Sequence, residues 1–209
     1  MTRRLLVHTR TTGYRHDSIP AALAAVGRFE GFAVDATEDP AALEGDLSRY
    51  AAVVFLSTSG DILTDAGRAG LAAAVESGTG FAGVHAAACT EESWPWYTGS
   101  LQRSRFAGHP PYGPGLVLVE DRSHPATAHL PRAWPWSDEW YDFAPCPDPA
   151  EVRVLLRGGE DRHPLAWHHR QGRGRVFWTA LGHAEEAYRD PAFLAHLRGG
   201  LEWTCGGRG

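Results

Sequence analysis

Apolar and polar residues alternate along the first half of the chain in a pattern typical of an α/β protein. Short apolar runs bounded by polar residues or glycine predict strands at residues 5–9, 32–36, 51–56 and 80–84. Residues recurring at helical spacing predict helices over 17–29 and 64–76, with a short helical turn over 40–47. Continuous apolar runs such as AAVVFL are typical of strands buried on both faces of a parallel sheet. We therefore expect right-handed β-α-β crossovers and helices on both faces of the sheet.

The amino-acid composition changes between residues 94 and 149, which are rich in Trp, Pro, His and Gly. This segment contains one clear strand pattern, at 116–120. We interpret this segment as a structured insertion, because flexible linkers are not rich in tryptophan. Three more strands and a closing helix are predicted at 152–156, 165–168, 175–179 and 191–203. Residues 1–209 together predict one doubly wound, flavodoxin-like α/β domain with a mostly parallel sheet.

Charge and composition narrow the classes of partner. The net charge of -5 comes without a block of like charges, which excludes a nucleic-acid groove and a membrane surface and favours a small-molecule partner. The first apolar run is too short for a signal peptide, and no stretch approaches a membrane span. The three cysteines show no C-x-x-C spacing, so a reducing cytoplasm fits best. The tryptophan-rich segment is compatible with a homodimer.

All 20 basic residues are arginines. Without a lysine, the chain has no Schiff-base nucleophile, no P-loop lysine and no lysine general base. Codon bias in a GC-rich genome is the ordinary explanation for this composition, but it still excludes aldolase-like, PLP-dependent and P-loop mechanisms.

Three histidines lie in the segments that follow predicted strands, where ligands of an open parallel sheet bind. His85 comes at a sharp turn before three alanines, and either acts as a base or ligand or fills the turn as a hydrogen-bonded plug. His183 follows the last strand and has the same two interpretations. His16, at the start of a helix, is a candidate ligand or a solvent-facing loop residue. We expect these imidazoles to meet in one pocket.

The insertion contributes further candidates. Asp138 and Glu139 are adjacent carboxylates followed by Trp140 and Tyr141, a combination that suits acid–base chemistry beside a sugar, or equally a solvated loop. His109 lies in a Gly-His-Pro sequence typical of a turn. It is either a structural turn residue or a residue of the site. Cys89, four residues past the sharp turn, is interpreted as a packed thiol.

A metal is a further interpretation of the same residues. His16, His85 and His183, with Glu139, supply enough nitrogen and oxygen ligands for a divalent ion such as zinc. They come from four separate segments without a local signature such as H-E-x-x-H. We therefore do not take a metal site as the leading interpretation.

Five segments in order resemble the ThuA-like (trehalose-utilisation) family. They are Gly13-Tyr-Arg-His16-Asp17-Ser-Ile, Gly83-Val-His85-Ala-Ala, Gly108-His109-Pro110, Asp138-Glu139-Trp140-Tyr141 and Gly174-Arg-Val-Phe-Trp-Thr-Ala-Leu-Gly-His183. The resemblance implies the fold of class I glutamine amidotransferases, with His85 where those enzymes carry the cysteine nucleophile. His183 keeps the histidine position, and Glu185 or Glu186 follows it. Amide transfer through an acyl-thiol intermediate is then excluded. The family also implies carbohydrate metabolism, beside sugar dehydrogenases that produce 3-keto disaccharides.

The leading hypothesis is therefore an enzyme acting on a keto-sugar or glycoside by His and Glu acid–base chemistry, giving isomerisation or elimination. The expected catalytic residues are His85, His183 and Glu139. The expected substrate-binding residues are Tyr14, Arg15, His16, Asp17, His109, Asp138, Trp140 and Tyr141. The alternatives are a non-catalytic sugar-binding or regulatory protein on the amidotransferase scaffold, and a metal-assisted hydrolase.

Overall fold

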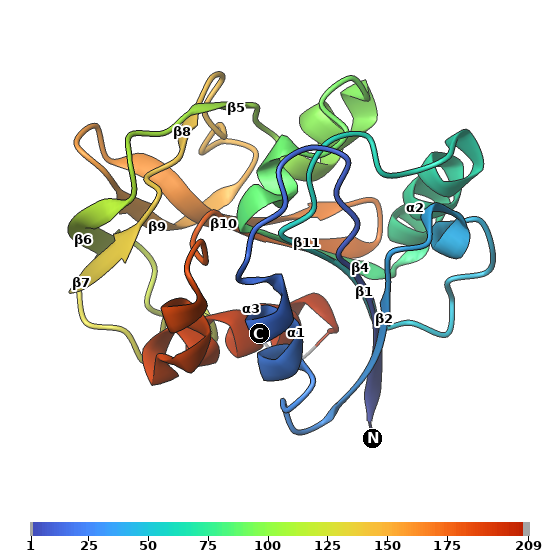
Figure 1. Cartoon of the computed structure of the whole chain (residues 1–209), viewed down its shortest axis with the longest axis horizontal. Coiled ribbons are helices and arrows are strands. Elements are labelled where there is room, and N and C mark those ends of the chain that lie inside the picture. The colour runs from blue at the N-terminus through green and yellow to red at the C-terminus, as the bar shows by residue number, and fades with distance from the viewer. Residues whose placement is uncertain (1, 207–209) are drawn as a thin grey trace.

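The computed structural model describes residues 2–206 and has a nine-stranded sheet at its centre (Figure 1). The strand order is β2-β1-β3-β4-β11-β10-β9-β6-β7. The pairings from β2 to β11 are parallel, and those from β11 to β7 are antiparallel. The predicted α/β class is confirmed, and the sheet is mixed. Within the described residues, no helix combines the length and hydropathy that crossing a bilayer requires.

The parallel half of the sheet follows the predicted alternation closely. Its elements are β1 (Arg3–His8), α1 (Ile19–Val26), β2 (Phe32–Thr37), η1 (Pro40–Leu43), β3 (Ala52–Leu56), α2 (Asp65–Ser77), β4 (Gly80–Val84) and β11 (Gly174–Thr179). Every residue of β3 and β4 is buried, as expected for strands covered on both faces. Helix α1 lies with the C-terminal helix α3 (Pro191–Thr204) on one side of the sheet, and α2 lies on the other (Figure 1).

The antiparallel half holds most of the differences from the sequence-based prediction. It contains β10 (His163–Gln171), β9 (Arg153–Gly158), β6 (Gly113–Val119) and β7 (Ala133–Asp138), and a separate ribbon pairs β5 (Phe106–Gly108) with β8 (Asp142–Phe143). Residues 94–149 therefore supply four strands instead of the single strand predicted, and two of them extend the main sheet. Pro135 obscured β7, because proline is tolerated in a sheet only at positions such as the edge strand that β7 is.

Two buried tryptophans attach the segment after β4 to the sheet. Trp167 on β10 and Trp178 on β11 are directly paired, and their rings stack at 5.9 Å. Their indole N–H groups donate to the carbonyls of Gln102 and Leu101, at 3.0 and 2.9 Å, in the π-helix η3 (Tyr97–Gln102). Gly83 on β4 has no side chain because a Cβ there would overlap the Trp178 ring. The turn that follows β4 is thus held against a rigid aromatic core.

Candidate functional site

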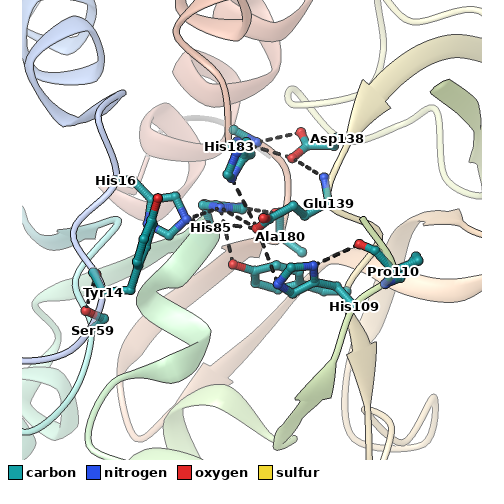
Figure 2. A network of polar contacts seen from close by, with 12 residues as sticks. Tyr14, His16, Ser59, His85, His109, Pro110, Asp138, Glu139, Ala180 and His183 are labelled. Atoms are coloured by element: carbon teal, nitrogen blue, oxygen red, sulfur yellow. Dashed lines mark hydrogen bonds and ion pairs between the residues drawn. The ribbon is translucent and has the colours of Figure 1, made fainter. Parts of the chain in front are cut away.

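The three strand-end histidines meet at the carboxyl edge of the parallel strands, as Figure 2 shows. The ring centroids of His16 and His85 lie 4.6 Å apart, those of His16 and His183 5.1 Å, and those of His85 and His183 5.4 Å. Glu139, from the segment after β7, points into the same cluster. Four segments that are distant in sequence therefore supply one group of ionisable side chains.

His85 is placed by the turn after β4. It begins the short 3-10 helix η2 (His85–Cys89) with φ of 51°, a left-handed conformation that costs a non-glycine residue about 1–2 kcal/mol. The imidazole is fully buried, and its Nδ1 donates to the Ala180 carbonyl at 2.8 Å. That bond fixes the tautomer, so Nε2 faces the cluster with a lone pair, 3.1 Å from Nε2 of His16.

His16 is placed by a loop that rests on the loop after β3. The N–H groups of Thr12 and Gly13 donate to the Ser59 carbonyl at 2.9 and 3.3 Å, and the Ser59 hydroxyl donates to the Tyr14 carbonyl at 2.6 Å. Burial lowers the pKa of His16 to about 3, and the nearness of the imidazoles of His85 and His183 further disfavours a positive charge on His16. The His16 imidazole is therefore neutral at physiological pH.

His183 is placed by the buried carboxylate of Asp138. That carboxylate accepts the backbone N–H of Gly182 at 2.8 Å, the N–H of His183 at 3.2 Å and the indole N–H of Trp136 at 2.9 Å. Gly182 has φ of 116°, a region that favours glycine. The loop after β11 is thereby fixed to the end of β7.

Glu139 is the group that all the site histidines share. Its Oε2 lies 3.1 Å from Nδ1 of His183, 3.5 Å from Nε2 of His85, 3.7 Å from Nε2 of His109 and 3.9 Å from Nε2 of His16. Burial tends to raise the pKa of Glu139, but the electrostatic effect of the neighbouring histidines, led by His85 and His183, outweighs it and lowers this pKa to about 2. Glu139 is a carboxylate at neutral pH.

Tyr141 and His109 complete the wall beside the cluster. The Tyr141 hydroxyl lies 3.2 Å from Nε2 of His85, and burial raises its pKa above the usual range. The His109 ring stacks on Tyr141 with centroids 5.4 Å apart. Nδ1 of His109 donates to the Pro110 carbonyl at 2.9 Å, which leaves Nε2 of His109 facing Glu139 (Figure 2).

Two cavities flank the cluster. The larger, of about 540 Å³, is lined by Gly13, Tyr14, His16, Ser59, Gly60, Ala86, Cys89, Glu92, Phe106, His109, Glu139 and Tyr141. The smaller, of about 290 Å³, is lined by Tyr14, His16, Asp17, Ser18, Tyr112, His183, Ala184 and Glu185. Tyr14 and His16 belong to both, so the ionisable groups lie where the two cavities meet.

The model of the family described as ThuA, trehalose utilisation, matches residues 4–204. The chain belongs to the ThuA family. A ThuA-like protein from Bacteroides uniformis is 24% identical, with a TM-score of 0.80 over 97% of this chain and 91% of that one. One from Parabacteroides merdae is 21% identical, with a TM-score of 0.81 over 98% and 90%. A protein from Salmonella typhimurium described as cytoplasmic is 12% identical, with a TM-score of 0.71 over 97% and 99%. No curated protein matches the chain.

In this ThuA family protein, four of the residues expected to bind substrate lie outside the larger cavity. Arg15 pairs with Glu38 at 2.7 Å and lines neither cavity. Asp138 is buried, and its oxygens are occupied by the backbone that it holds. Trp140 is buried and donates to the Gly113 carbonyl at 3.0 Å. The fourth, Asp17, lines only the smaller cavity of the two.

The structure also adds residues to the ThuA site that the sequence did not single out. The Tyr112 ring lies 5.3 Å from that of His183, at the mouth of the smaller cavity. Its position between prolines and glycines resembles an ordinary turn, so composition gave no signal. Glu185 pairs with Arg189 at 2.9 Å, whereas the carboxylate beside His183 is that of Glu139. The carboxylate in contact with His183 is therefore not that of Glu185, which the sequence had placed beside it.

Proposed function

We propose that this ThuA family protein is an enzyme of carbohydrate metabolism that moves a proton next to the carbonyl of a keto-sugar or keto-glycoside, giving isomerisation or elimination. The observation that carries the proposal is the contact of one carboxylate, Glu139, with four histidines where two cavities meet. The family description, trehalose utilisation, supports a sugar as the substrate class.

Proton transfer needs a base that reaches the substrate and an acid that stabilises the developing oxyanion. Glu139 and His109 both line the larger cavity, and Glu139 is ionised, so these two are the groups best placed to exchange a proton with a bound sugar. His183 borders the smaller cavity. His85, which is fully buried, acts in this proposal by positioning Glu139 and Tyr141.

Exposed aromatic faces support a carbohydrate ligand. Among the described residues, the exposed large hydrophobic side chains are those of Tyr14, Tyr112 and Leu116. Tyr14 lines both cavities of the cluster, Tyr112 lines the smaller one, and Leu116 lines a neighbouring cavity of about 730 Å³ that shares His109. Exposed apolar side chains that line cavities are typical of a ligand site, and aromatic rings pack well on the apolar face of a sugar.

The scaffold that belongs to this proposal is one domain over residues 1–209, with a doubly wound, flavodoxin-like parallel half and residues 94–149 as an insertion. We also propose that the protein works in the cytoplasm on a small-molecule sugar. Amide transfer is no part of the proposal, because burial raises the pKa of the Cys89 thiol to about 12 and leaves it protonated.

The test is incubation of the purified protein with a panel of 3-keto disaccharides and ketoses in deuterated water, with products identified by NMR. Proton transfer predicts deuterium at the carbon next to the carbonyl. Glu139→Gln is expected to lower turnover by roughly 10²–10⁴-fold. Glu151→Gln, an exposed carboxylate paired with Arg103, is the matched control. Full activity of Glu139→Gln would remove this residue from the reaction, and sugar binding without turnover would favour a non-catalytic sugar-binding protein.

A further inference from the structure

We infer that His16, His85, His183 and Glu139 form a binding site for one divalent first-row transition-metal ion. One ligand atom from each of the four residues lies within 4.8 Å of the others. In a tetrahedral site with bonds of about 2.1 Å, ligand atoms are about 3.4 Å apart. The nearest separations here are 3.1 Å from His16 to His85 and 3.1 and 3.5 Å from Glu139 to His183 and His85. The other separations are wider, 3.9 Å from Glu139 to His16 and 4.8 Å at most, so these atoms must approach by up to about 1.4 Å when an ion binds.

The orientation of the imidazoles leaves lone pairs pointing inward. Nδ1 of His85 donates to the Ala180 carbonyl, which is the outer hydrogen bond that metal-bound histidines generally make. The two Nε2 atoms of His16 and His85 face each other. Nδ1 of His183 is buried and has no hydrogen-bond partner, although Glu139 is 3.1 Å away, because the approach lacks hydrogen-bond geometry. A cation between these atoms satisfies all of them at once.

The ligand set defines the class of ion. Three neutral imidazoles and one carboxylate suit zinc, iron(II), cobalt, nickel or manganese, whereas calcium and magnesium prefer oxygen ligands. A divalent ion with one carboxylate ligand keeps a net positive charge. Such an ion polarises a carbonyl oxygen as a Lewis acid.

The ion would be accessible to a ligand. His16 and Glu139 line the larger cavity, and His16 and His183 line the smaller one, so the site opens to both. Four protein ligands fill a tetrahedral shell, so a substrate oxygen would reach the ion as a fifth ligand, an expansion that catalytic zinc sites undergo. Because the four ligands are then committed to the ion, His109 is the cavity-facing group left to move a proton. This last step rests on the proposed function, whereas metal binding itself needs no sugar.

The experiment measures metal binding directly. The purified protein is stripped with a chelator and titrated with Zn²⁺ and Co²⁺ by calorimetry, the metal content is determined by mass spectrometry, and the Co²⁺ spectrum reports the coordination. We expect one ion per chain, a rise in Tm on loading, and a loss of at least tenfold in affinity in His85→Gln, His183→Gln and Glu139→Gln. His109→Gln and Tyr141→Phe change groups that contact the ligands but supply none, so their loss of affinity should be smaller than that of the ligand variants.

Absence of stoichiometric binding by the stripped wild-type protein would overturn the inference, as would equal losses in His109→Gln and His183→Gln. If a ligand variant fails to fold, the wild-type titration and the Co²⁺ spectrum still test whether the protein binds one ion through these residues. Metal binding without turnover of any sugar contradicts the proposed function alone. Turnover by metal-free protein that binds no ion contradicts the metal site alone.

Discussion

The carboxylate of Asp138 accepts the backbone N–H of His183 at 3.2 Å, so a residue of β7 fixes the loop that follows β11. The same carboxylate also accepts the N–H of Gly182, the N–H of Glu139 and the indole N–H of Trp136. A residue expected from the sequence to bind substrate therefore holds two members of the cluster, His183 and Glu139, in place.

Asp138→Asn should weaken the site and the fold together. The asparagine amide presents a donor where the carboxylate accepts, and in either orientation that donor faces backbone or indole N–H groups. We expect a loss of roughly 1–3 kcal/mol in the free energy of unfolding and of about 10–100-fold in metal affinity. Urea denaturation and calorimetry measure the two effects. Asp142→Asn, at a half-exposed carboxylate paired with His163, is the control. An Asp138→Asn protein with the metal affinity of the wild type would contradict the prediction.

Gly60→Ala should displace His16 without disrupting the sheet. Gly60 has φ of 75°, and a Cβ there would overlap the Thr12 hydroxyl and lie 2.9 Å from the Gly13 nitrogen. Thr12 and Gly13 begin the loop that carries His16. We expect at least a tenfold loss of metal affinity, with the far-ultraviolet circular dichroism spectrum unchanged. Gly45→Ala is the matched glycine control, because nothing lies within 4 Å of its added Cβ.

Tyr112→Ala should weaken sugar binding while leaving the fold intact. Tyr112 is 46% exposed and lies beside His183 in the lining of the smaller cavity, so little packing is lost with it. An aromatic contact contributes roughly 0.5–1.5 kcal/mol, which corresponds to about a two- to tenfold rise in Kd for a bound keto-sugar. Calorimetry and Tm measure the two properties. Tyr112→Phe keeps the ring face and should restore the affinity; equal weakening in both variants would argue against stacking.

Stability should fall in mild acid because of buried histidines outside the site. Burial lowers the pKa of His124 to about 3 and those of His169 and His196 to about 4, from an ordinary value of 6.5. Above the ordinary value both states are neutral, and the stabilising contribution is complete. Below it the unfolded chain binds protons first, so stability is lost as the pH falls from about 6.5 towards the folded pKa values. At about pH 5 each histidine should cost roughly 2 kcal/mol.

Urea denaturation between about pH 7.5 and pH 5 measures this loss. His124→Asn is the matched variant, since an asparagine oxygen replaces the acceptor that Nδ1 of His124 offers to the N–H of Ala126, without titrating. It should show a shallower dependence on pH than the wild type. A free energy of unfolding that stays constant across this range would contradict the prediction.

The parallel half of the fold was predictable because its signals are local. Continuous apolar runs such as that of β3, the threonine cap of α2 at Thr64 and the proline that starts α3 at Pro191 each specify an element within a few residues. The order of the strand-end histidines then follows from parallel topology, which brings carboxyl ends of strands to one edge. The convergence of His16, His85 and His183 is confirmed on that basis.

The antiparallel half of the sheet, and the distinct roles of Asp138 and Glu139 at the site, were not predictable in this way. Strand β7 contains Pro135, and its pairing with β6 depends on a partner that no local pattern identifies. Asp138 and Glu139 are adjacent and chemically alike, and only the backbone that arrives from β11 turns one into a support and leaves the other facing four histidines.

The amino-acid sequence by itself determined which segments become buried strands and that three imidazoles stand at their ends, because both depend on short-range patterns of hydrophobicity. Tertiary structure alone decided which atoms of those imidazoles carry free lone pairs, which carboxylate joins them and where the cavities open. These properties depend on hydrogen bonds such as that from His85 to Ala180, whose partners lie 95 residues apart in the chain.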